Sequence, residues 1–140
     1  METSELLERV GKSELFEHFD IKIEKAEKGF AVITMPVTTK VHQYIGIMNG
    51  GISVLLAETA ASIGAVVSSD LKQVTPVGIE INANHLRAVS KGMLRVEAKS
   101  IYHGRTLSVW NIEITDERGK LICVSRCTIN LKKGAAFPEK

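Results

Sequence analysis

The chain has 140 residues, enough for one domain with a sizeable core, and its apolar and charged fractions of 44% and 24% are ordinary for a globular protein. The formal net charge is only +2 and the Lys and Arg residues are scattered, so neither nucleic acid nor an anionic membrane is an expected partner. Aromatic residues make up 5% of the chain, which is poor for stacking on bases.

The N-terminal segment, residues 1–20, is predicted to be helical. Apolar residues recur at helical spacing between Glu5 and Phe19, and Gly11 predicts a break near the middle. The segment is charged and amphipathic and does not resemble a signal peptide. We therefore expect a cytoplasmic location.

Strands are predicted on both sides of a long apolar helix. Two strands lie between Ile21 and Pro36, and a loop then leads to a helix from Gly50 to about Ser69. Period-two alternation and turn residues predict four later strands, at 77–89, 93–102, 106–115 and 121–131. Without repeats or linkers, residues 1–140 form a single predicted domain, with a frayed tail at 133–140.

The long helix is apolar on every side. Its length would suit a membrane span, but Glu58 lies at its centre, and a lone carboxylate in a bilayer costs several kcal/mol. A helix that is apolar all round is one that is buried all round. The sequence therefore predicts an α+β fold in which a curved antiparallel sheet wraps around one long buried helix, with a second subunit helping to cover it.

The two cysteines, Cys123 and Cys127, are interpreted as core residues. Four residues apart in a strand, they point to the same face at a separation of about 13 Å, too far for a disulfide. No His or further Cys lies beside them, which argues against a zinc site. We expect no metal site.

The start of the long helix is unusual. Asn49 is a good N-cap residue, whereas Gly50 and Gly51 each cost about 1 kcal/mol against Ala inside a helix. Free N–H groups and a partial positive charge at a helix start would let a carbonyl oxygen approach, as in an oxyanion hole. Tight packing explains the glycines equally well.

Glu58 needs a partner or a function, because a carboxylate on an apolar helix is expensive. A structural pairing with an arginine is one interpretation, the candidates being Arg87, Arg95 and Arg105. The other is a nucleophile or general base in an apolar pocket, with Ser62 one helical turn later on the same face.

Gly50 and Glu58 are too far apart to act together within one chain. Eight helical residues span about 12 Å, whereas reacting atoms must approach to about 3–3.5 Å. If both residues serve one reaction, they come from two chains that meet at a two-fold interface.

Three stretches resemble the hotdog-fold acyl-CoA thioesterases: "HQYIGIMNGGISVLLAETAAS", "VGIEINANHLRA" and "YHGRTLSVWNIEITDERGKLICVSRCTINL". The resemblance covers roughly residues 30–131 and is closest to the branch that hydrolyses 4-hydroxybenzoyl-CoA and 1,4-dihydroxy-2-naphthoyl-CoA. It implies a hotdog fold, dimers that pair into tetramers, and sites between subunits. It also implies thioester hydrolysis in which acyl-CoA is the substrate and neither a metal nor a redox cofactor takes part.

The resemblance also implies roles for individual residues. Glu58 would be the catalytic carboxylate, the Gly50 N–H would polarise the thioester carbonyl, Gln43 would place the carbonyl or the attacking water, and Ser62 would help to position water. The family commonly has His where this chain has Asn49. Asn can still donate a hydrogen bond and cap the helix, so a positioning role is retained, but it cannot titrate near neutral pH, so an acid role is in doubt.

Four residues match family positions near the CoA part of the substrate: His85, Arg87, Arg105 and Thr106. Arginine side chains and exposed N–H groups suit a phosphate, although solvated charges at strand ends are an equally good interpretation. Two rival functions remain, a non-catalytic acyl-CoA-binding protein and a hotdog dehydratase or hydratase. The helix lacks the Asp/His pair that the second would need.

Overall fold

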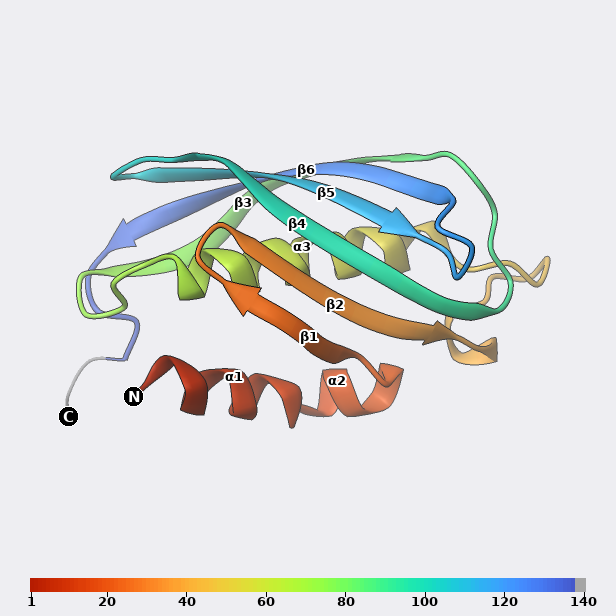
Figure 1. Ribbon diagram of the computed structural model, residues 1–140, viewed down its shortest axis with the longest axis horizontal. Coiled ribbons are helices and arrows are strands. Elements are labelled where there is room, and N and C mark those ends of the chain that lie inside the picture. Colours follow the sequence, from red (N-terminus) through yellow and green to blue (C-terminus); the bar gives the residue numbers. More distant parts are fainter. Residues whose placement is uncertain (138–140) are drawn as a thin grey trace.

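A six-stranded antiparallel sheet curves over one long helix in the computed structural model, which describes residues 1–137 (Figure 1). The strand order is β1-β2-β4-β5-β6-β3, so β1 and β3 are the two edges. This is the predicted fold. The elements are α1 (Thr3–Gly11), α2 (Glu14–Phe19), β1 (Lys22–Glu27), β2 (Phe30–Val37), the 3-10 turn η1 (Thr39–Val41), α3 (Gly50–Val67), β3 (Val74–His85), β4 (Gly92–His103), β5 (Leu107–Thr115) and β6 (Leu121–Lys133).

The N-terminal segment forms two short helices with a break after Gly11, as predicted. Helix α1 buries none of its residues completely. It lies alongside β1 and below α3, outside the sheet (Figure 1). Helix α1 therefore covers part of α3 on a side that the sheet does not reach.

The edge strand β3 differs from the prediction at both ends. It begins at Val74, before Pro76, because an edge strand tolerates a residue without an N–H group. It ends at His85 and not at Val89, because the chain turns away there and the N–H group of Leu86 donates to the Ile122 carbonyl at 2.8 Å. Strand β3 hydrogen-bonds to β6 on one side only, and its other edge is unpaired among residues 1–137.

The end of the chain is anchored, so the prediction of a frayed tail is wrong for residues 133–137. Strand β6 continues to Lys133. Beyond it, the N–H groups of Gly134 and Ala136 donate to the carbonyls of Gln73 and Leu71 at 2.9 and 3.0 Å. Residues 138–140 of the predicted tail lie outside the described residues.

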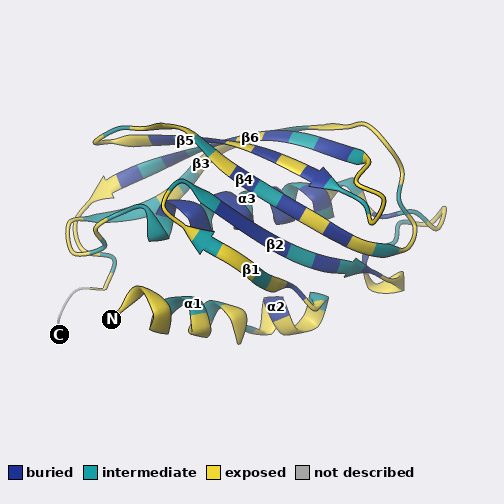
Figure 2. Ribbon diagram, viewed as in Figure 1, coloured by how far each residue is buried: buried dark blue, intermediate teal, exposed yellow. Residues whose placement is uncertain are grey.

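Helix α3 packs one side against the sheet. Eight of its residues are buried there: Ser53, Leu56, Ala57, Ala60, Ala61, Ile63, Gly64 and Ala65. Small side chains let the helix approach the sheet closely, where the buried Trp110 ring lies against Gly64. Glu58 and Ser62 lie outside this buried set, with Glu58 directed toward the β3 edge, and both are only half-buried. Buried and less buried segments alternate along α3 (Figure 2). The prediction that α3 is buried all round is therefore not met within one chain.

By length and composition alone α3 could cross a membrane, but it is the core helix of this fold and lies against the sheet (Figure 1). The sheet contributes the rest of the core through residues such as Ile33, Leu94 and Ile112, all fully buried. Cys123 and Cys127 are free thiols in this core, as predicted.

Candidate active site

The start of α3 is capped by Asn49, as the sequence predicts. The Asn49 side chain accepts a hydrogen bond from the Gly51 N–H at 2.8 Å. The Gly50 N–H has no hydrogen-bond partner among residues 1–137. One donor with the partial positive charge of a helix N-terminus is thus available to a ligand at Gly50.

The loop before α3 is held in place by backbone hydrogen bonds. His42 and Met48 form an isolated β-bridge, the Met48 N–H donates to the Val89 carbonyl, and the Asn49 N–H donates to the Val41 carbonyl, both at 2.8 Å. Gln43 lies in this loop and lines a cavity of about 300 Å³ together with Gly50. The loop therefore holds Gln43 at the same cavity as the helix start.

His85 and Arg87 line the same cavity. A Cβ atom on Gly50 would lie 3.0 Å from Nε2 of His85, so the imidazole lies directly against the helix start. The family resemblance implied a place for His85 near the CoA portion only, and the 35-residue separation between His85 and Gly50 gives no sign of the contact. His42, by contrast, is occupied, since its Nε2 lies 2.8 Å from the Ser90 carbonyl oxygen.

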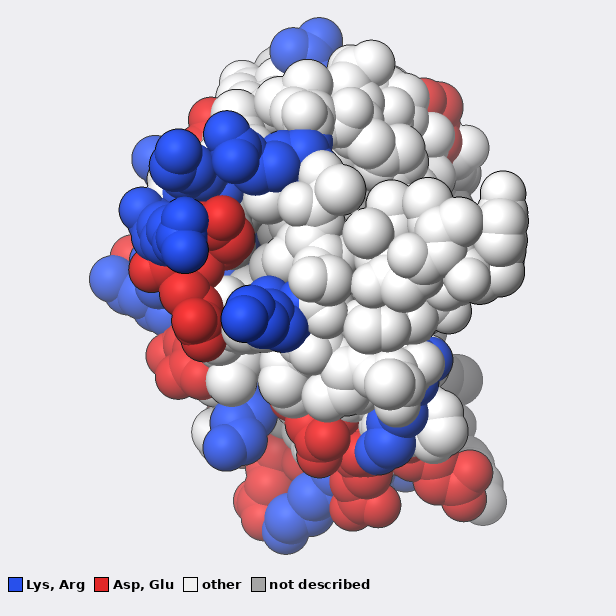
Figure 3. Space-filling model, turned by 90° about the vertical axis from the view of Figure 1, so that its right-hand side faces the viewer, with Lys and Arg blue, Asp and Glu red and all other residues white. Residues whose placement is uncertain are grey.

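The end of the molecule that carries this cavity presents a broad surface without charged side chains (Figure 3). The loops at this end (Figure 1) expose three large apolar side chains, those of Tyr44, Ile45 and Leu86. Lys, Arg, Asp and Glu gather along one side and at the base of the view (Figure 3).

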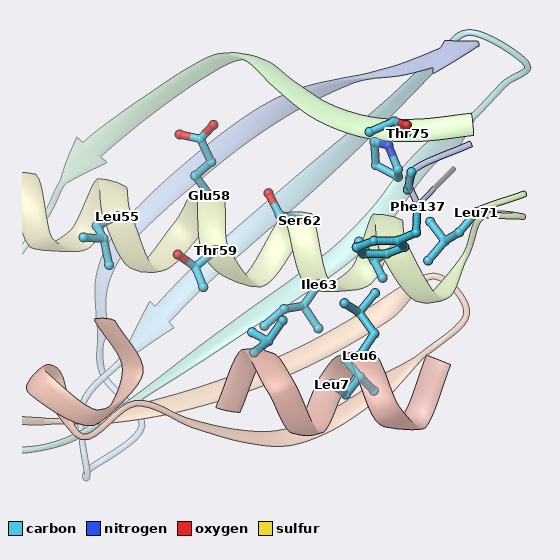
Figure 4. Close-up of a pocket in the computed structure, with 14 residues that line it drawn as sticks. Leu6, Leu7, Leu55, Glu58, Thr59, Ser62, Ile63, Leu71, Thr75 and Phe137 are labelled. Carbon is cyan, nitrogen blue, oxygen red and sulfur yellow. The ribbon is translucent and has the colours of Figure 1, made fainter. Parts of the chain in front are cut away.

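Glu58 lies in a different cavity, of about 500 Å³, together with Thr59 and Ser62. Glu58 and Ser62 point from α3 toward β3 (Figure 4). The Glu58 carboxylate makes no hydrogen bond or salt bridge with residues 1–137. Arg95 lies near Glu97 instead, so the interpretation of Glu58 as the partner of a structural arginine is not supported within the chain.

The Glu58 carboxylate lies under the edge strand at Gly78, where a Cβ atom would overlap with Oε1. The carboxylate is also close enough to affect the pKa of the core residue Cys127. Burial, followed by the charges of Glu58 and Glu80, raises the pKa of the Cys127 thiol to about 12. Cys127 is therefore protonated at neutral pH and is not a candidate nucleophile.

The two cavities are separate within one chain. Helix α3 runs unbroken from Gly50 past Glu58, which keeps the two residues about 12 Å apart along the axis. In the described part of the chain, no residue lines both cavities. Gly50 lies near the His85 end of β3 and Glu58 lies near Gly78 of the same strand. The chain thus carries two separate candidate half-sites along one sheet edge, the Gly50 half-site and the Glu58 half-site.

The four residues assigned to CoA fall into two pairs. His85 and Arg87 belong to the Gly50 half-site. Arg105 and Thr106 lie in the exposed β4–β5 turn, where the Thr106 carbonyl accepts from the Leu131 N–H. Leu131 pairs with Pro76, which lines the Glu58 cavity. His85 pairs with Cys123 at the other end of β6, about 26 Å away for eight strand residues.

Some cavity-lining residues were not identified from the sequence. Thr59 adds a second hydroxyl beside Glu58, and α1 and Phe137 line the same cavity. Thr59 could have been found from its place next to Glu58 on α3, whereas nothing local indicates that α1 and Phe137 meet there. Among residues 1–137, no group of three His, Cys, Asp or Glu side chains is arranged to hold a metal ion.

The family model of the thioesterase superfamily matches residues 45–123 of this chain. This range includes α3 and most of both half-sites.

Individual relatives match over most of their length. The chain is 50% identical over 119 residues to the 1,4-dihydroxy-2-naphthoyl-CoA hydrolase of Listeria monocytogenes, covering 85% of this chain and 96% of that protein. It is 38% identical to the enzyme of the same name from Escherichia coli, covering 90% and 92%. The crystal structure of a mutant thioesterase from Pseudomonas aeruginosa superposes with a TM-score of 0.86 at 33% identity, covering 92% and 93%.

Proposed function

This chain belongs to the thioesterase superfamily and is a thioester hydrolase, and we propose that its substrate is an acyl-CoA with an aromatic or otherwise bulky acyl group. The candidates are 1,4-dihydroxy-2-naphthoyl-CoA, after which two relatives are named, and 4-hydroxybenzoyl-CoA, which the family resemblance implies. The observation that carries the proposal is the unpaired Glu58 carboxylate in a largely apolar cavity.

Glu58 is the reacting carboxylate in this proposal. It acts either as the nucleophile that attacks the thioester carbonyl or as the general base that takes a proton from water. An unpaired, half-buried carboxylate is suited to both roles, because no fixed cation neutralises it. Ser62 lines the same cavity one helical turn away and is placed to hold the water.

The Gly50 N–H is the proposed donor to the oxygen that becomes negative when the carbonyl is attacked. Its support is the free N–H at the start of α3. Asn49 keeps the helix start in position through its bond to Gly51, and Gln43 lines the cavity beside Gly50, where it can orient the carbonyl or the water.

One complete site needs two chains, so we propose a homodimer, with pairs of dimers forming a homotetramer as the family resemblance implies. The free edge of β3 exposes Val77 and Ile79, and unpaired edges of this kind are templates for pairing with another chain. Antiparallel pairing of two β3 strands near their middle would place the Gly50 end of one chain beside the Glu58 end of its partner.

The same pairing would unite the two pairs of CoA residues. His85 and Arg87 would come from one chain, and Arg105 and Thr106 from its partner, giving two arginines for the phosphates. We place the protein in the cytoplasm, and we propose that it uses neither a metal nor a redox cofactor, because carboxylate and oxyanion-donor chemistry suffices for thioester hydrolysis.

The proposal is tested by measuring free-thiol release from benzoyl-, 4-hydroxybenzoyl-, 1,4-dihydroxy-2-naphthoyl-, phenylacetyl- and straight-chain acyl-CoA. We expect the aromatic or bulky substrates to have the highest kcat/KM, and a chelator to leave the rates unchanged. Preference for acetyl-CoA over every bulky substrate would contradict the proposed substrate class.

A further inference from the structure

The cavity beside Glu58 has a polar end and an apolar end. Glu58, Thr59 and Ser62 supply the polar end. The opposite end is lined by apolar side chains from four parts of the chain (Figure 4): Leu6, Val66, Leu71, Ala136 and Phe137. Thr75 also lies at this end, but its hydroxyl already donates to the Gly134 carbonyl at 3.0 Å. The apolar end therefore offers a ligand no side-chain hydroxyl donor, because Thr75 keeps only its capacity to accept a hydrogen bond.

The cavity is long enough for a substantial acyl group. Glu58 and Val66 are eight residues apart on α3, which corresponds to about 12 Å along the helix. Its volume of about 500 Å³ lies within the usual range of roughly 300–1,000 Å³ for small-molecule pockets. An acyl group whose carbonyl reacts at Glu58 would thus extend toward Leu71 and Phe137.

The outer wall of this cavity is built by α1 and by Phe137, which are far apart in the sequence. Leu6, Leu7 and Val10 of α1 face it and are only half-buried. The Ala136 N–H donates to the Leu71 carbonyl, and this bond directs the following residue, Phe137, to the cavity. Phe137 is 47% exposed there. Such half-exposed apolar side chains gain further burial when an apolar ligand enters.

We propose that α1 and Phe137 are the specificity-determining wall of the acyl pocket, contacting the part of the acyl group farthest from the thioester. The proposal rests on the proposed thioesterase function and deepens it. The wall selects acyl groups that are polar next to the thioester and bare hydrocarbon at the far end, since a polar group placed against these apolar side chains would exchange hydrogen bonds to water for at most one acceptor, Thr75.

This selectivity distinguishes two aromatic substrates. In a 1,4-dihydroxy-2-naphthoyl group both hydroxyls are on the ring that bears the carbonyl, and the second ring is unsubstituted. In a 4-hydroxybenzoyl group the only hydroxyl lies at the far end. The apolar end therefore favours the naphthoyl group, and removal of the wall weakens that preference.

The test compares Phe137→Ala and Leu6→Ala with Leu15→Ala, a matched control on the exposed face of α2 that does not line the cavity. The substrates are 2-naphthoyl-CoA, 4-hydroxybenzoyl-CoA and acetyl-CoA. Since contacts in an apolar pocket change kcat/KM by about 10–200-fold per methylene-sized group, we expect each wall variant to lose about tenfold with 2-naphthoyl-CoA. Acetyl-CoA, which is too short to reach the wall, should be unaffected, and Leu15→Ala should behave as the unmodified protein.

Equal changes for all three substrates, or no change in either wall variant, would overturn the assignment. A second measurement separates this outcome from failure of the proposed function. If the unmodified protein releases no thiol from any acyl-CoA, amide chemical shifts are followed during titration with free 2-naphthoate. Shifts in α1 and at Phe137 that weaken in Phe137→Ala would support the wall, and their absence would refute it.

Discussion

Gly78 and Glu58 occupy adjoining space, because a Cβ atom on Gly78 would overlap with Oε1 of the Glu58 carboxylate. Strand β3 therefore has no side chain at the point where the proposed reacting carboxylate of Glu58 lies. A methyl group there can be accommodated by moving the flexible end of Glu58, so we expect Gly78→Ala to fold normally and to place the carboxylate wrongly. Misplacement of about 1 Å can cost roughly 10²-fold in rate. Steady-state kinetics should show this loss mainly in kcat, with an unchanged melting temperature.

The control for this prediction is Gly11→Ala, the same substitution at a glycine that does not line the Glu58 cavity and where a Cβ atom would meet nothing within 4 Å. Normal turnover in Gly78→Ala would mean that the position of the carboxylate is not important for the reaction.

Glu58→Gln should abolish hydrolysis and leave acyl-CoA binding largely intact. The change is nearly isosteric, so the packing of α3 is conserved, and it removes a charge that has no partner in the chain. Stability should hold or rise. Loss of a nucleophile or general base typically costs at least about 10²–10⁴-fold. Thiol release measures the loss and calorimetric titration measures binding; wild-type turnover would disprove the catalytic assignment.

Gly50→Pro isolates the contribution of the Gly50 N–H. Gly50 is the first residue of α3, a position where proline is well tolerated, and Asn49 has the extended backbone that proline requires before it (φ −61°, ψ 132°). Loss of one oxyanion donor should lower kcat by about 10²–10³-fold.

The matched control is Gly50→Ala, which keeps the N–H and, like proline, places a Cβ atom 3.0 Å from His85 Nε2. If the alanine variant is as slow as the proline variant, displacement of His85 and not loss of the donor explains the effect.

Asn49 is expected to act through the helix start. Asn49→Ala removes the acceptor for the Gly51 N–H and should lower the free energy of unfolding by about 0.5–2 kcal/mol. Asn49→His should keep or raise turnover, because the family resemblance tolerates His at this position. Thermal unfolding and thiol release measure the two effects, and an alanine variant unchanged in both would show that Asn49 neither caps nor positions.

Features that depend on neighbouring residues were predictable from the sequence. The cap at Asn49, the break after Gly11 and the alternation in β4 and β5 each arise from a few consecutive residues and their periodicity. The fold class followed from α3, because a helix so uniformly apolar requires cover beyond one flat surface.

Features that depend on distant residues were not predictable. Strand β3 extends back to Val74 because it is an edge, and edge position is set by pairing with β6. The tail is anchored by carbonyls more than 60 residues earlier, at Leu71 and Gln73. The contact between His85 and Gly50 depends in the same way on where β3 ends relative to α3.

The two-chain site makes a prediction about mixtures of inactive variants. Glu58→Gln and Gly50→Pro should each be inactive as homo-oligomers, because every site lacks one half. In a mixed dimer, the intact Gly50 of one chain meets the intact Glu58 of the other, while the second site lacks both. Random mixing of subunits should therefore restore about a quarter of wild-type activity, since half of the dimers are mixed and each has one working site.

The experiment co-refolds equal amounts of the two variants and measures thiol release, with each variant refolded alone as the control. Light scattering on the same samples should show dimers or tetramers. Recovery of activity requires that the two residues act from different chains, because neither variant carries both. If the mixture stays inactive while mass spectrometry of tagged chains shows mixed oligomers, or if an active monomer is found, Gly50 and Glu58 do not form a shared site across the β3 edge.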